Sequence, residues 1–588
     1  MLRAFIRKSL LLVLTLVPLG ASAAPVRWWP RQRPPKALVR VPGWGPKAES
    51  PAGTLVTGSL GATHMLAQSL AGLAAQAVNE GQSDEMVWIE TDNPSYRLWY
   101  AGLIERLELE QRGSFDPWQL VDRYRKKGLI AGYVLYRYDR SAGRVNDWRP
   151  EIDMSANVAT TVAGLRRAVL IEEQLEATAK KHGLKMVFDA RTMTPSECFE
   201  TFKDHLNHTT MLTQDPRVPH NRAMAIAHKC AVAYGTQAPV AEIMASLESP
   251  APIMGWNCGG EDEHTALPSR FGHFQTASNW ALNLPILSAG TDEYEPAKIK
   301  ALDPRNIDWD DGRHAVSFIL SDGDNVQWML GNFFTNPAYW SSSYRGAIPF
   351  GWTSCPAHLS QVCPEALDYL ARTQPAHGSI IEYGGGYHYP DLFGAARDDP
   401  KLLEKFARRV SGHMQRTGAR IFGFICMDVD SPTARHAYKV YAAHIEGLVG
   451  MIAVQYYPYD GGDGEVFWVR NSRGIEIPVA TCKFSLWRDA HWRRGGDPAK
   501  IARLINESAA RAQARNERLH CWTVVHAWSR FERASDPTES QAGPAPAVWC
   551  AQRLEKNVAV VSPEELLWRM RMEHDPEATK TIITQYKD

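Results

Sequence analysis

The chain has 588 residues, of which 44% are hydrophobic and 22% charged, shares that are typical of a globular protein. This composition excludes disordered, collagen-like and coiled-coil proteins as well as small disulfide-rich scaffolds. Because 65 basic and 65 acidic residues cancel, no basic surface is available for a phosphate backbone, and we expect no nucleic-acid partner.

The start of the chain has the pattern of a secretory signal peptide. Three basic residues precede an apolar run from Ser9 to Leu19, and Ala21-Ser22-Ala23 matches an A-x-A cleavage site. The apolar run is too short to cross a bilayer, which takes about 20 residues. We therefore expect residues 1–23 to be removed, and the mature protein to be periplasmic or secreted without a membrane span.

The next segments predict an arm followed by an α/β domain. Residues 24–50 hold a Pro, Trp and Arg cluster without periodicity, which indicates an extended N-terminal arm lying on the body. From 51 to 305 short apolar strands alternate with helices, which is typical of a parallel sheet covered by helices. The expected elements are a helix at 62–80, strands at 86–91, 131–137 and 184–190, and a long helix at 157–182. No strand is followed by a nucleotide-binding glycine motif, and we expect no cofactor.

Residues 306–588 contain eight apolar runs of strand length, and most are followed by an amphipathic helix. The runs end at Ser321, Trp352, Tyr383, Asp428, Tyr456, Phe484, Trp528 and Val561. The 240 residues from the first end to the last match a (β/α)8 barrel, which takes about 250. Residues 457–475 are rich in Gly and Asp where the fifth helix belongs, so we expect a barrel that is irregular or open there. The predicted fold class is α/β, with an α/β domain preceding a (β/α)8-like barrel.

Acidic residues stand at the carboxyl ends of the expected strands, which is where the active sites of such barrels lie. Asp322 and Asp324 follow the first strand, Glu382 lies at the end of the third, and Asp428 ends the fourth. Cleavage of a glycosidic bond requires two carboxyl groups, one protonated and one ionised. We expect at least two of these four carboxyl groups to face a common cleft as catalytic residues, and Asp324 ranks last because it could cap the next helix.

Aromatic and polar residues near the same strand ends are expected to bind the substrate. Tyr and Trp rings can stack on the C–H faces of sugar rings. The expected substrate-binding residues are Trp352, Gly384, Gly386, Tyr387, His388, Tyr389, Tyr456, Asp460, His526 and Trp528.

Two other functions could use such residues. Asp with His could bind a metal, as in a metal-dependent polysaccharide deacetylase, although no H-x-x-x-H follows the first Asp motif. A catalytically inactive barrel could instead bind glycans. We favour the carboxylate pair over the metal and assign no metal ligands.

Two further features leave alternatives open. The polar segment from Trp256 to His264 follows a strand-like run, and it could form the wall of a shared cleft or cap the next helix, of which we expect the cap. Cys355 and Cys363, two of nine cysteines, could close a local disulfide.

The string from Gly384 to Pro390 fits the pattern G-x-G-Y-x-Y-P. With SDGDN at 321–325, it makes the chain resemble the GxGYxYP putative glycoside hydrolase family, to which 254–264 and 278–288 also look similar. The resemblance covers most of the mature chain. It implies a barrel-like C-terminal domain and an oligosaccharide or polysaccharide substrate, without supplying established catalytic residues. The sequence makes no prediction of oligomeric state.

Overall fold

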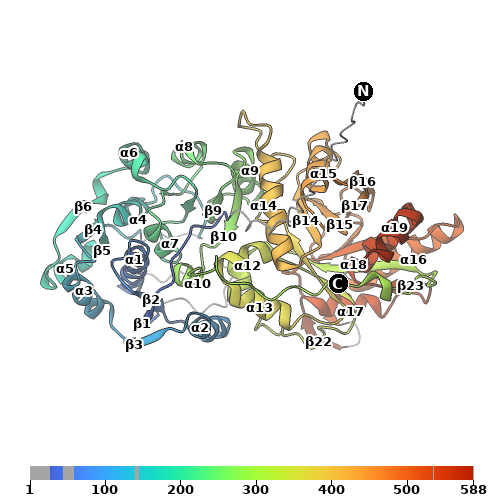
Figure 1. The fold of residues 1–588 in the computed structure, drawn as a ribbon, viewed down its shortest axis with the longest axis horizontal. Helices are drawn as coiled ribbons and strands as arrows, with labels where there is room; N and C mark the ends of the chain where they lie inside the picture. Colours follow the sequence, from blue (N-terminus) through green and yellow to red (C-terminus); the bar gives the residue numbers. More distant parts are fainter. Residues whose placement is uncertain (1–26, 44–58, 140–144, 237, 534–535, 587–588) are drawn as a thin grey trace, which may run out of the picture.

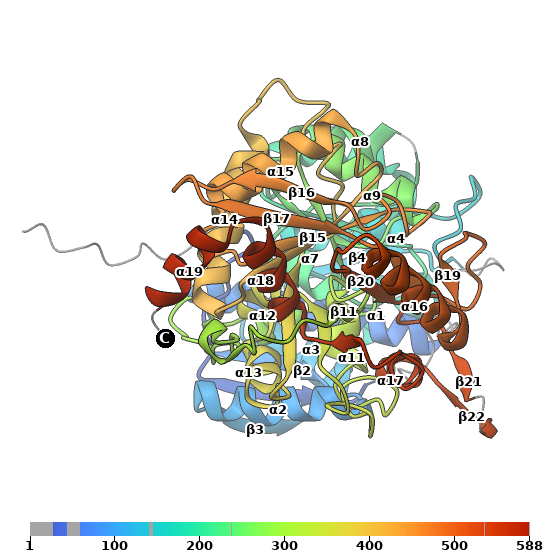
Figure 2. The same ribbon diagram turned by 90° about the vertical axis from the view of Figure 1, so that its right-hand side faces the viewer.

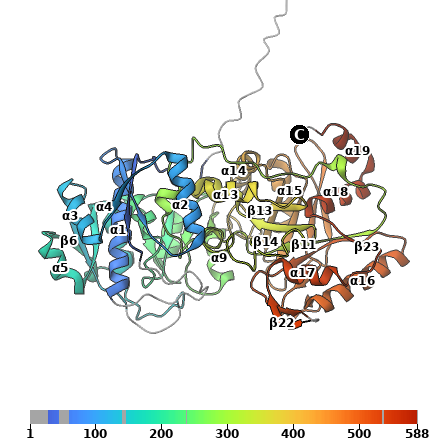
Figure 3. The same ribbon diagram turned by 90° about the horizontal axis from the view of Figure 1, so that it is seen from below.

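The computed structural model describes residues 27–43, 59–139, 145–236, 238–533 and 536–586. An N-terminal half, up to residue 289, lies beside a C-terminal half, from residue 314, along the long axis (Figures 1 and 3). The predicted α/β class is confirmed. The expected signal peptide at 1–23 lies outside the described residues. Within the ranges given above, no helix combines the length and hydropathy needed to cross a membrane.

The N-terminal half contains three small parallel sheets with strand orders β2-β1-β3, β5-β4-β6 and β10-β9-β7-β8. The strands are β1 (Ala37–Val41), β2 (Glu85–Ile89), β3 (Glu110–Ser114), β4 (Gly132–Tyr136), β5 (Ala168–Glu172), β6 (Met186–Asp189), β7 (Met211–Thr213), β8 (Val232–Ala233), β9 (Pro252–Gly255) and β10 (Phe274–Ala277). The helices are α1 (Ser59–Asn79), α2 (Pro94–Leu107), α3 (Pro117–Lys126), α4 (Ser155–Arg166), α5 (Glu176–Lys181), α6 (Pro195–Phe202), α7 (Arg222–Ala227), α8 (Ala238–Ser246), α9 (Glu261–Arg270) and α10 (Leu284–Leu287).

Two expectations for this half are wrong. The segment 37–41, expected in an extended arm, is the central strand of the first sheet, between β2 and β3. The helix expected at 157–182 is divided into α4, β5 and α5. Arg167 ends α4 in a left-handed conformation with φ of 49°, and the apolar run after it is buried as a strand over its whole length.

The C-terminal half is built on one curled sheet with the order β16-β17-β15-β14-β13-β12-β11-β20-β18-β19 (Figure 2). The strands are β11 (His314–Leu320), β12 (Phe350–Ser354), β13 (Gly378–Tyr383), β14 (Ile421–Cys426), β15 (Gly450–Gln455), β16 (Val466–Arg470), β17 (Glu476–Thr481), β18 (Phe484–Leu486), β19 (Gly495–Gly496), β20 (His520–Val525) and β23 (Val558–Val560), with a separate hairpin of β21 (Phe531–Arg533) and β22 (Asp536–Gln541). The helices are α11 (Val326–Gly331), α12 (Pro356–Val362), α13 (Pro364–Arg372), α14 (Leu402–Thr417), α15 (Pro432–His444), α16 (Pro498–Ala514), α17 (Pro544–Ala551), α18 (Pro563–His574) and α19 (Pro576–Thr584).

The curled sheet closes at the sixth apolar run predicted from the sequence, which is divided into β17 and β18. β17 pairs with β15 and β18 pairs with β20, yet only Cys482 and Lys483 separate β17 from β18. The amide of Cys482 donates to the carbonyl of Ala453 in β15 at 3.2 Å, and that of Lys483 to the carbonyl of Trp522 in β20 at 3.1 Å. The irregularity predicted at 457–475 is confirmed, because that segment holds β16, antiparallel to β17, and no helix. The eighth strand, β23, pairs with the start of β11.

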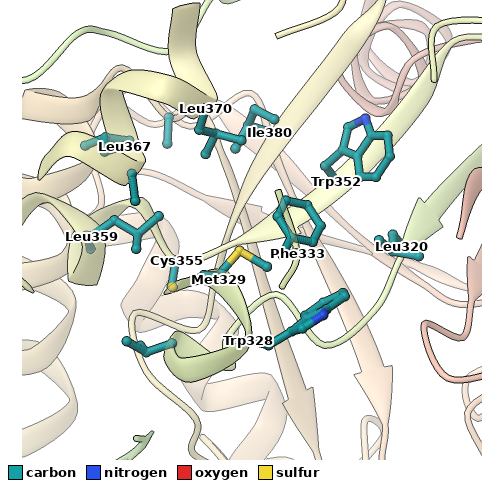
Figure 4. Packing of buried hydrophobic residues seen from close by; sticks show 14 of the residues in the cluster. Leu320, Trp328, Met329, Phe333, Trp352, Cys355, Leu359, Leu367, Leu370 and Ile380 are labelled. Carbon is teal, nitrogen blue, oxygen red and sulfur yellow. The ribbon is translucent and has the colours of Figure 1, made fainter. Parts of the chain in front are cut away.

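Alternate residues of the strands face two different cores. The outer core lies between the sheet and α11 to α14, and Trp352, Phe333 and Ile380 pack there (Figure 4). The inner core lies inside the curl, where Leu567 of α18 packs with Ile452. The nine cysteines are all free and buried, so the local disulfide considered for Cys355 and Cys363 is not formed.

The segment 384–397, directly after β13, joins the two halves. Tyr387 and Gln275 of β10 form an antiparallel bridge, with N–H···O distances of 2.8 and 2.9 Å. The three glycines at 384–386 have φ of 77°, 63° and 122°, conformations that L side chains rarely adopt. A Cβ atom at Gly386 would lie 2.3 Å from the ring of Phe274. The glycines therefore allow this segment to approach the N-terminal half closely.

Replacing Gly386 by Ala should destabilise the protein by more than about 2 kcal/mol, because the new methyl group meets a buried ring and the backbone is strained. Gly447→Ala is the matched control, since its φ is 77° and its Cβ would meet nothing within 4 Å. The control should lose about 1–2 kcal/mol. Urea unfolding midpoints measure both changes, and equal losses would contradict the inferred close packing.

Candidate active site

Three half-buried carboxyl groups lie together where the two halves meet, and we call them the carboxyl cluster. Asp322 and Asp324 follow β11, and Glu261 begins α9 of the N-terminal half. Burial and the charges of Asp322 and Glu261 raise the pKa of Asp324 well above its usual range. Burial and the charge of Asp322 raise the pKa of Glu261 to about 7, although a hydrogen bond with Tyr387 opposes this. Burial and neighbouring negative charge thus favour the protonated forms of Glu261 and Asp324.

The SDGDN turn holds Asp322 in place. Asp322 has φ of 67°, a left-handed conformation that Asp tolerates better than most residues. Its Oδ1 accepts a hydrogen bond from Trp528 Nε1 at 2.9 Å, and its Oδ2 accepts one from Ser321 Oγ. Both oxygens of Asp322 therefore act as hydrogen-bond acceptors, which fixes the orientation of its carboxyl group.

Gly323 and Asn325 position Asp324. A Cβ atom at Gly323 would lie 2.0 Å from the backbone of Thr353, so only glycine lets the turn cross β12 this closely. Asn325 Oδ1 caps α11 by accepting from the amide of Trp328 at 3.1 Å. The alternative that Asp324 caps this helix is excluded, and Asp324, a predicted catalytic candidate, is a member of the carboxyl cluster.

Tyrosines surround the carboxyl cluster. Burial, followed by negative charges in the carboxyl cluster, raises the pKa values of Tyr383, Tyr387 and Tyr459 well above the usual range. The hydroxyl groups of Tyr387 and Tyr389 lie 3.3 Å apart, and the ring of Tyr389 packs at 5.9 Å from that of Tyr456. These phenols stay protonated and can donate hydrogen bonds to a carboxylate or a ligand.

An aromatic group lies on the other side of Asp322. His526 stacks on Trp487 with ring centroids 3.4 Å apart. Burial lowers the pKa of His526, and the negative charge of Asp322 opposes this change. Trp528 packs against Trp328 at 4.8 Å and remains 40% exposed. Flat, accessible rings therefore border the carboxyl cluster.

The structure brings together about half of the residues predicted from the sequence. Those at the carboxyl cluster or packed around it are Asp322, Asp324, Tyr387, Tyr389, Tyr456, His526 and Trp528. Gly384 and Gly386 act indirectly, through the backbone conformation that places Tyr387.

Two of the predicted catalytic carboxyl groups lie elsewhere. Glu382 faces the opposite side of β13 from Tyr383, and its Oε2 accepts from the amide of Ala357 at the start of α12 at 2.7 Å. Burial raises the pKa of Glu382 to about 8. Asp428 is exposed in the turn before α15, where its Oδ1 accepts from the amide of Asp430 at 2.9 Å. The structure thus gives both residues roles in local turns and helix starts.

Three predicted substrate-binding residues also point away from the carboxyl cluster. Trp352 has no exposed surface and packs against Phe350 and Trp340 in the outer core. His388 is buried, with Nδ1 donating to the carbonyl of Gly386 at 3.1 Å and Nε2 accepting from the hydroxyl of Tyr441 at 2.8 Å. Asp460 is buried in an ion pair with Arg494 at 3.2 Å.

Glu261 is the functional candidate that the sequence analysis did not select. It lies in the polar segment 256–264, which was expected to cap a helix, but the N-cap of α9 is Gly260 and no side chain caps it. The sequence did contain a signal for Glu261, because three acidic residues follow the carboxyl end of the parallel strand β9.

In the chain as described, no group of three or more His, Cys, Asp and Glu side chains is arranged to hold a metal ion.

Comparisons with known proteins match most of the chain. Family models match residues 312–571 (GxGYxYP putative glycoside hydrolase C-terminal domain), 130–208 (GxGYxYP_N second domain) and 208–289 (GxGYxYP third domain). The crystal structure of a putative hydrolase from Bacteroides thetaiotaomicron VPI-5482 is similar with a TM-score of 0.74 at 20% identity, over 94% of this chain and 98% of that chain. This similarity shows a shared fold.

A second solved structure, of a putative polysaccharide deacetylase from Mycobacterium smegmatis, covers 47% of this chain and 95% of that chain at 13% identity. Its TM-score of 0.27 is too low to indicate a shared fold. No sequence among the curated proteins matches the chain.

Glu382→Gln tests whether this carboxyl group is structural. The pKa of about 8 in the folded protein lies above the ordinary value of 4.5, so ionisation is disfavoured by folding. The parental protein should lose stability as the pH rises from about 4.5 to about 8. The amide variant keeps an oxygen for Ala357 and should show a weaker dependence of melting temperature on pH.

Glu382→Ala loses the hydrogen bond to the amide of Ala357 and should lower the free energy of unfolding by about 1–2 kcal/mol. A folded Glu382→Gln protein without activity would restore Glu382 as a catalytic candidate.

Proposed function

The chain belongs to the GxGYxYP putative glycoside hydrolase family, and we propose that it is an exported hydrolase that cleaves a glycosidic bond in an oligosaccharide or polysaccharide. The observation that carries this proposal is the carboxyl cluster of Glu261, Asp322 and Asp324, bordered by accessible aromatic rings. Glycoside hydrolysis uses two carboxyl groups on opposite sides of the scissile bond, and the carboxyl cluster contains groups in different protonation states.

Glu261 is the proposed general acid. With a pKa of about 7, it holds a proton near neutral pH and can pass it to the leaving oxygen of the glycosidic bond. When the leaving group departs, the Glu261 carboxylate can accept a proton from water and return to its starting state. A buried group with this pKa is well matched to both steps.

Asp322 is the proposed nucleophile or general base. Its two oxygens accept hydrogen bonds from Trp528 and Ser321, which fix the direction of the carboxyl group. Asp324, whose pKa is raised by burial and by both neighbours, stays protonated and can donate a hydrogen bond within the carboxyl cluster. One carboxylate and two carboxylic acids then satisfy the electrostatics of the site.

Exposed rings next to these groups supply the surface for a sugar. Large hydrophobic side chains are exposed at five described positions, and two of them are Trp528, at 40%, and Tyr457, at 58%. Trp528 donates a hydrogen bond to Asp322. Tyr457 follows Tyr456 in the chain, and burial, followed by the negative charge of Glu261, raises the pKa of the Tyr456 phenol. Such rings can stack on the C–H faces of a sugar while their polar atoms face water.

Glu261→Gln should lower kcat by about 10²–10⁴ on an unactivated glycan, because the proton donor is lost while shape is kept. In the parental enzyme, kcat/KM should fall as the pH rises through about 7, where Glu261 loses its proton, and the variant should lack this limb. An aryl glycoside whose leaving group needs no proton should be affected much less. A screen of purified protein for reducing ends released from a glycan panel supplies the substrate.

Two variants make this experiment decisive. Glu263→Gln changes an exposed carboxylate in the same helical turn and should retain the parental rate. Asp322→Asn should abolish turnover of both substrate types. If Glu261→Gln turns over the unactivated glycan at the parental rate, Glu261 is not the acid. If the parental protein binds a glycan of the panel without cleaving any, the inactive glycan-binding alternative replaces the hydrolase.

Export is the second part of the proposal. The apolar run before Ala21-Ser22-Ala23 should direct the chain out of the cytoplasm and end in cleavage after Ala23. Mass spectrometry of the protein expressed in its natural host should find Ala24 as the first residue, in the periplasmic or secreted fraction. Protein that retains Met1 in the cytoplasm would disprove export.

A further inference from the structure

A large cavity lies at the end of the barrel opposite to the carboxyl cluster. Its volume is about 750 Å³, within the range typical of small-molecule sites. Residues just before β14 and β15 line it, together with the turn between β16 and β17 and parts of α18 and α19. The carboxyl cluster lies beyond the opposite, carboxyl ends of the strands, so the cavity is separate from the candidate active site.

Most of the charged residues that line this cavity are basic. Four basic residues, Lys298, Arg420, Arg473 and Arg571, compare with two acidic ones, Asp303 and Glu446. Asp303 is already paired with Arg305 at 2.7 Å. The basic residues come from four separate segments of the chain, so the tertiary fold gathers them into one place.

Arg571 is the most unusual of these residues. Its side chain belongs to a residue only 5% exposed, and no carboxylate among the described residues lies within ion-pair distance of it. One nitrogen, Nη1, donates to the carbonyl of Val449 at 3.4 Å, and the guanidinium lies 4.7 Å from the centre of the Trp568 ring. Burial, followed by the positive charge of Arg473, lowers the pKa of Arg571 to about 10.

A buried cation without a counter-ion is costly, and a like charge beside it adds to the cost. A guanidinium has five N–H donors in a planar fork, and most of those of Arg571 remain without a protein acceptor in the described structure. Oxyanions with two or more oxygens match this fork and would neutralise the local charge. Apolar residues such as Trp568, Ile475 and Ile582 line other parts of the cavity and suit the carbon portion of a ligand.

We propose that this cavity is a binding site for a small organic anion whose carboxylate, sulfate or phosphate group is held by Arg571 and Arg473. Arg420 and Lys298 add positive potential at its rim. The Trp568 ring holds the Arg571 guanidinium from one side, so the fork is oriented before the anion binds. Because the cavity is remote from the carboxyl cluster, this site does not depend on the proposed hydrolase activity.

Calorimetric titration of the full-length mature protein with sodium sulfate, sodium phosphate and sodium glucuronate tests the proposal. All three titrations are run at constant ionic strength, with chloride as the balancing anion. We expect saturable binding of at least one of the three, and the strongest binder identifies the head group. Arg571→Met and Arg473→Gln should each weaken that binding by about 10–100-fold, through loss of a charge-assisted hydrogen bond.

Arg470→Gln is the matched control, because Arg470 is an exposed arginine in the same hairpin and pairs with Glu476 outside the cavity. It should leave the affinity unchanged. Removal of an uncompensated buried charge should also leave Arg571→Met at least as stable as the parental protein without ligand. Saturable binding that Arg571→Met and Arg473→Gln leave intact would overturn the proposal. So would failure of all three anions to bind, whatever the stability of Arg571→Met.

Discussion

The close contact between the segment 384–397 and the N-terminal half is the interaction on which the candidate site depends. Three glycines in left-handed conformations bring Tyr387 into backbone pairing with Gln275 of β10. The same segment also donates hydrogen bonds to the end of α9, where the amide of Gly394 donates to the carbonyl of Ser269 at 2.8 Å. α9 carries Glu261 at its other end, so this docking sets the distance between Glu261 and the aspartates after β11.

Electrostatics gives this arrangement its chemical character. Carboxyl groups supplied by one domain alone could be spaced to avoid repulsion, but here Glu261 and two aspartates are held together by the packing of two halves. Burial and crowding raise the pKa values of Glu261 and Asp324, while Trp528 and Ser321 donate hydrogen bonds to the two oxygens of Asp322. The fold thereby holds proton donors beside Asp322, at the cost of repulsion in the site.

Several features of the candidate site were readable in the sequence because they are local. Asp322 and Asp324 directly follow a strand, and the carboxyl ends of parallel strands must lie at one end of a barrel. Tyr387 and Tyr389 belong to the short motif that follows β13, and the structure places their hydroxyl groups 3.3 Å apart. Glu382 failed as a catalytic candidate because a shift of one residue along a strand places a side chain on the opposite face. Its neighbour Tyr383 faces the carboxyl cluster instead.

The sequence by itself determined the α/β class, the eight apolar runs that supply strands of the curled sheet and the irregularity at 457–475, because these follow from local apolar runs and turn residues. It also showed the family resemblance through one short motif. Only the tertiary structure decided that Glu261 joins Asp322 and Asp324, that 37–41 is a central strand, and that basic residues from distant segments line one cavity. Periodicity reports which face of an element is buried, whereas the partner of that face is set by packing between segments far apart in the chain.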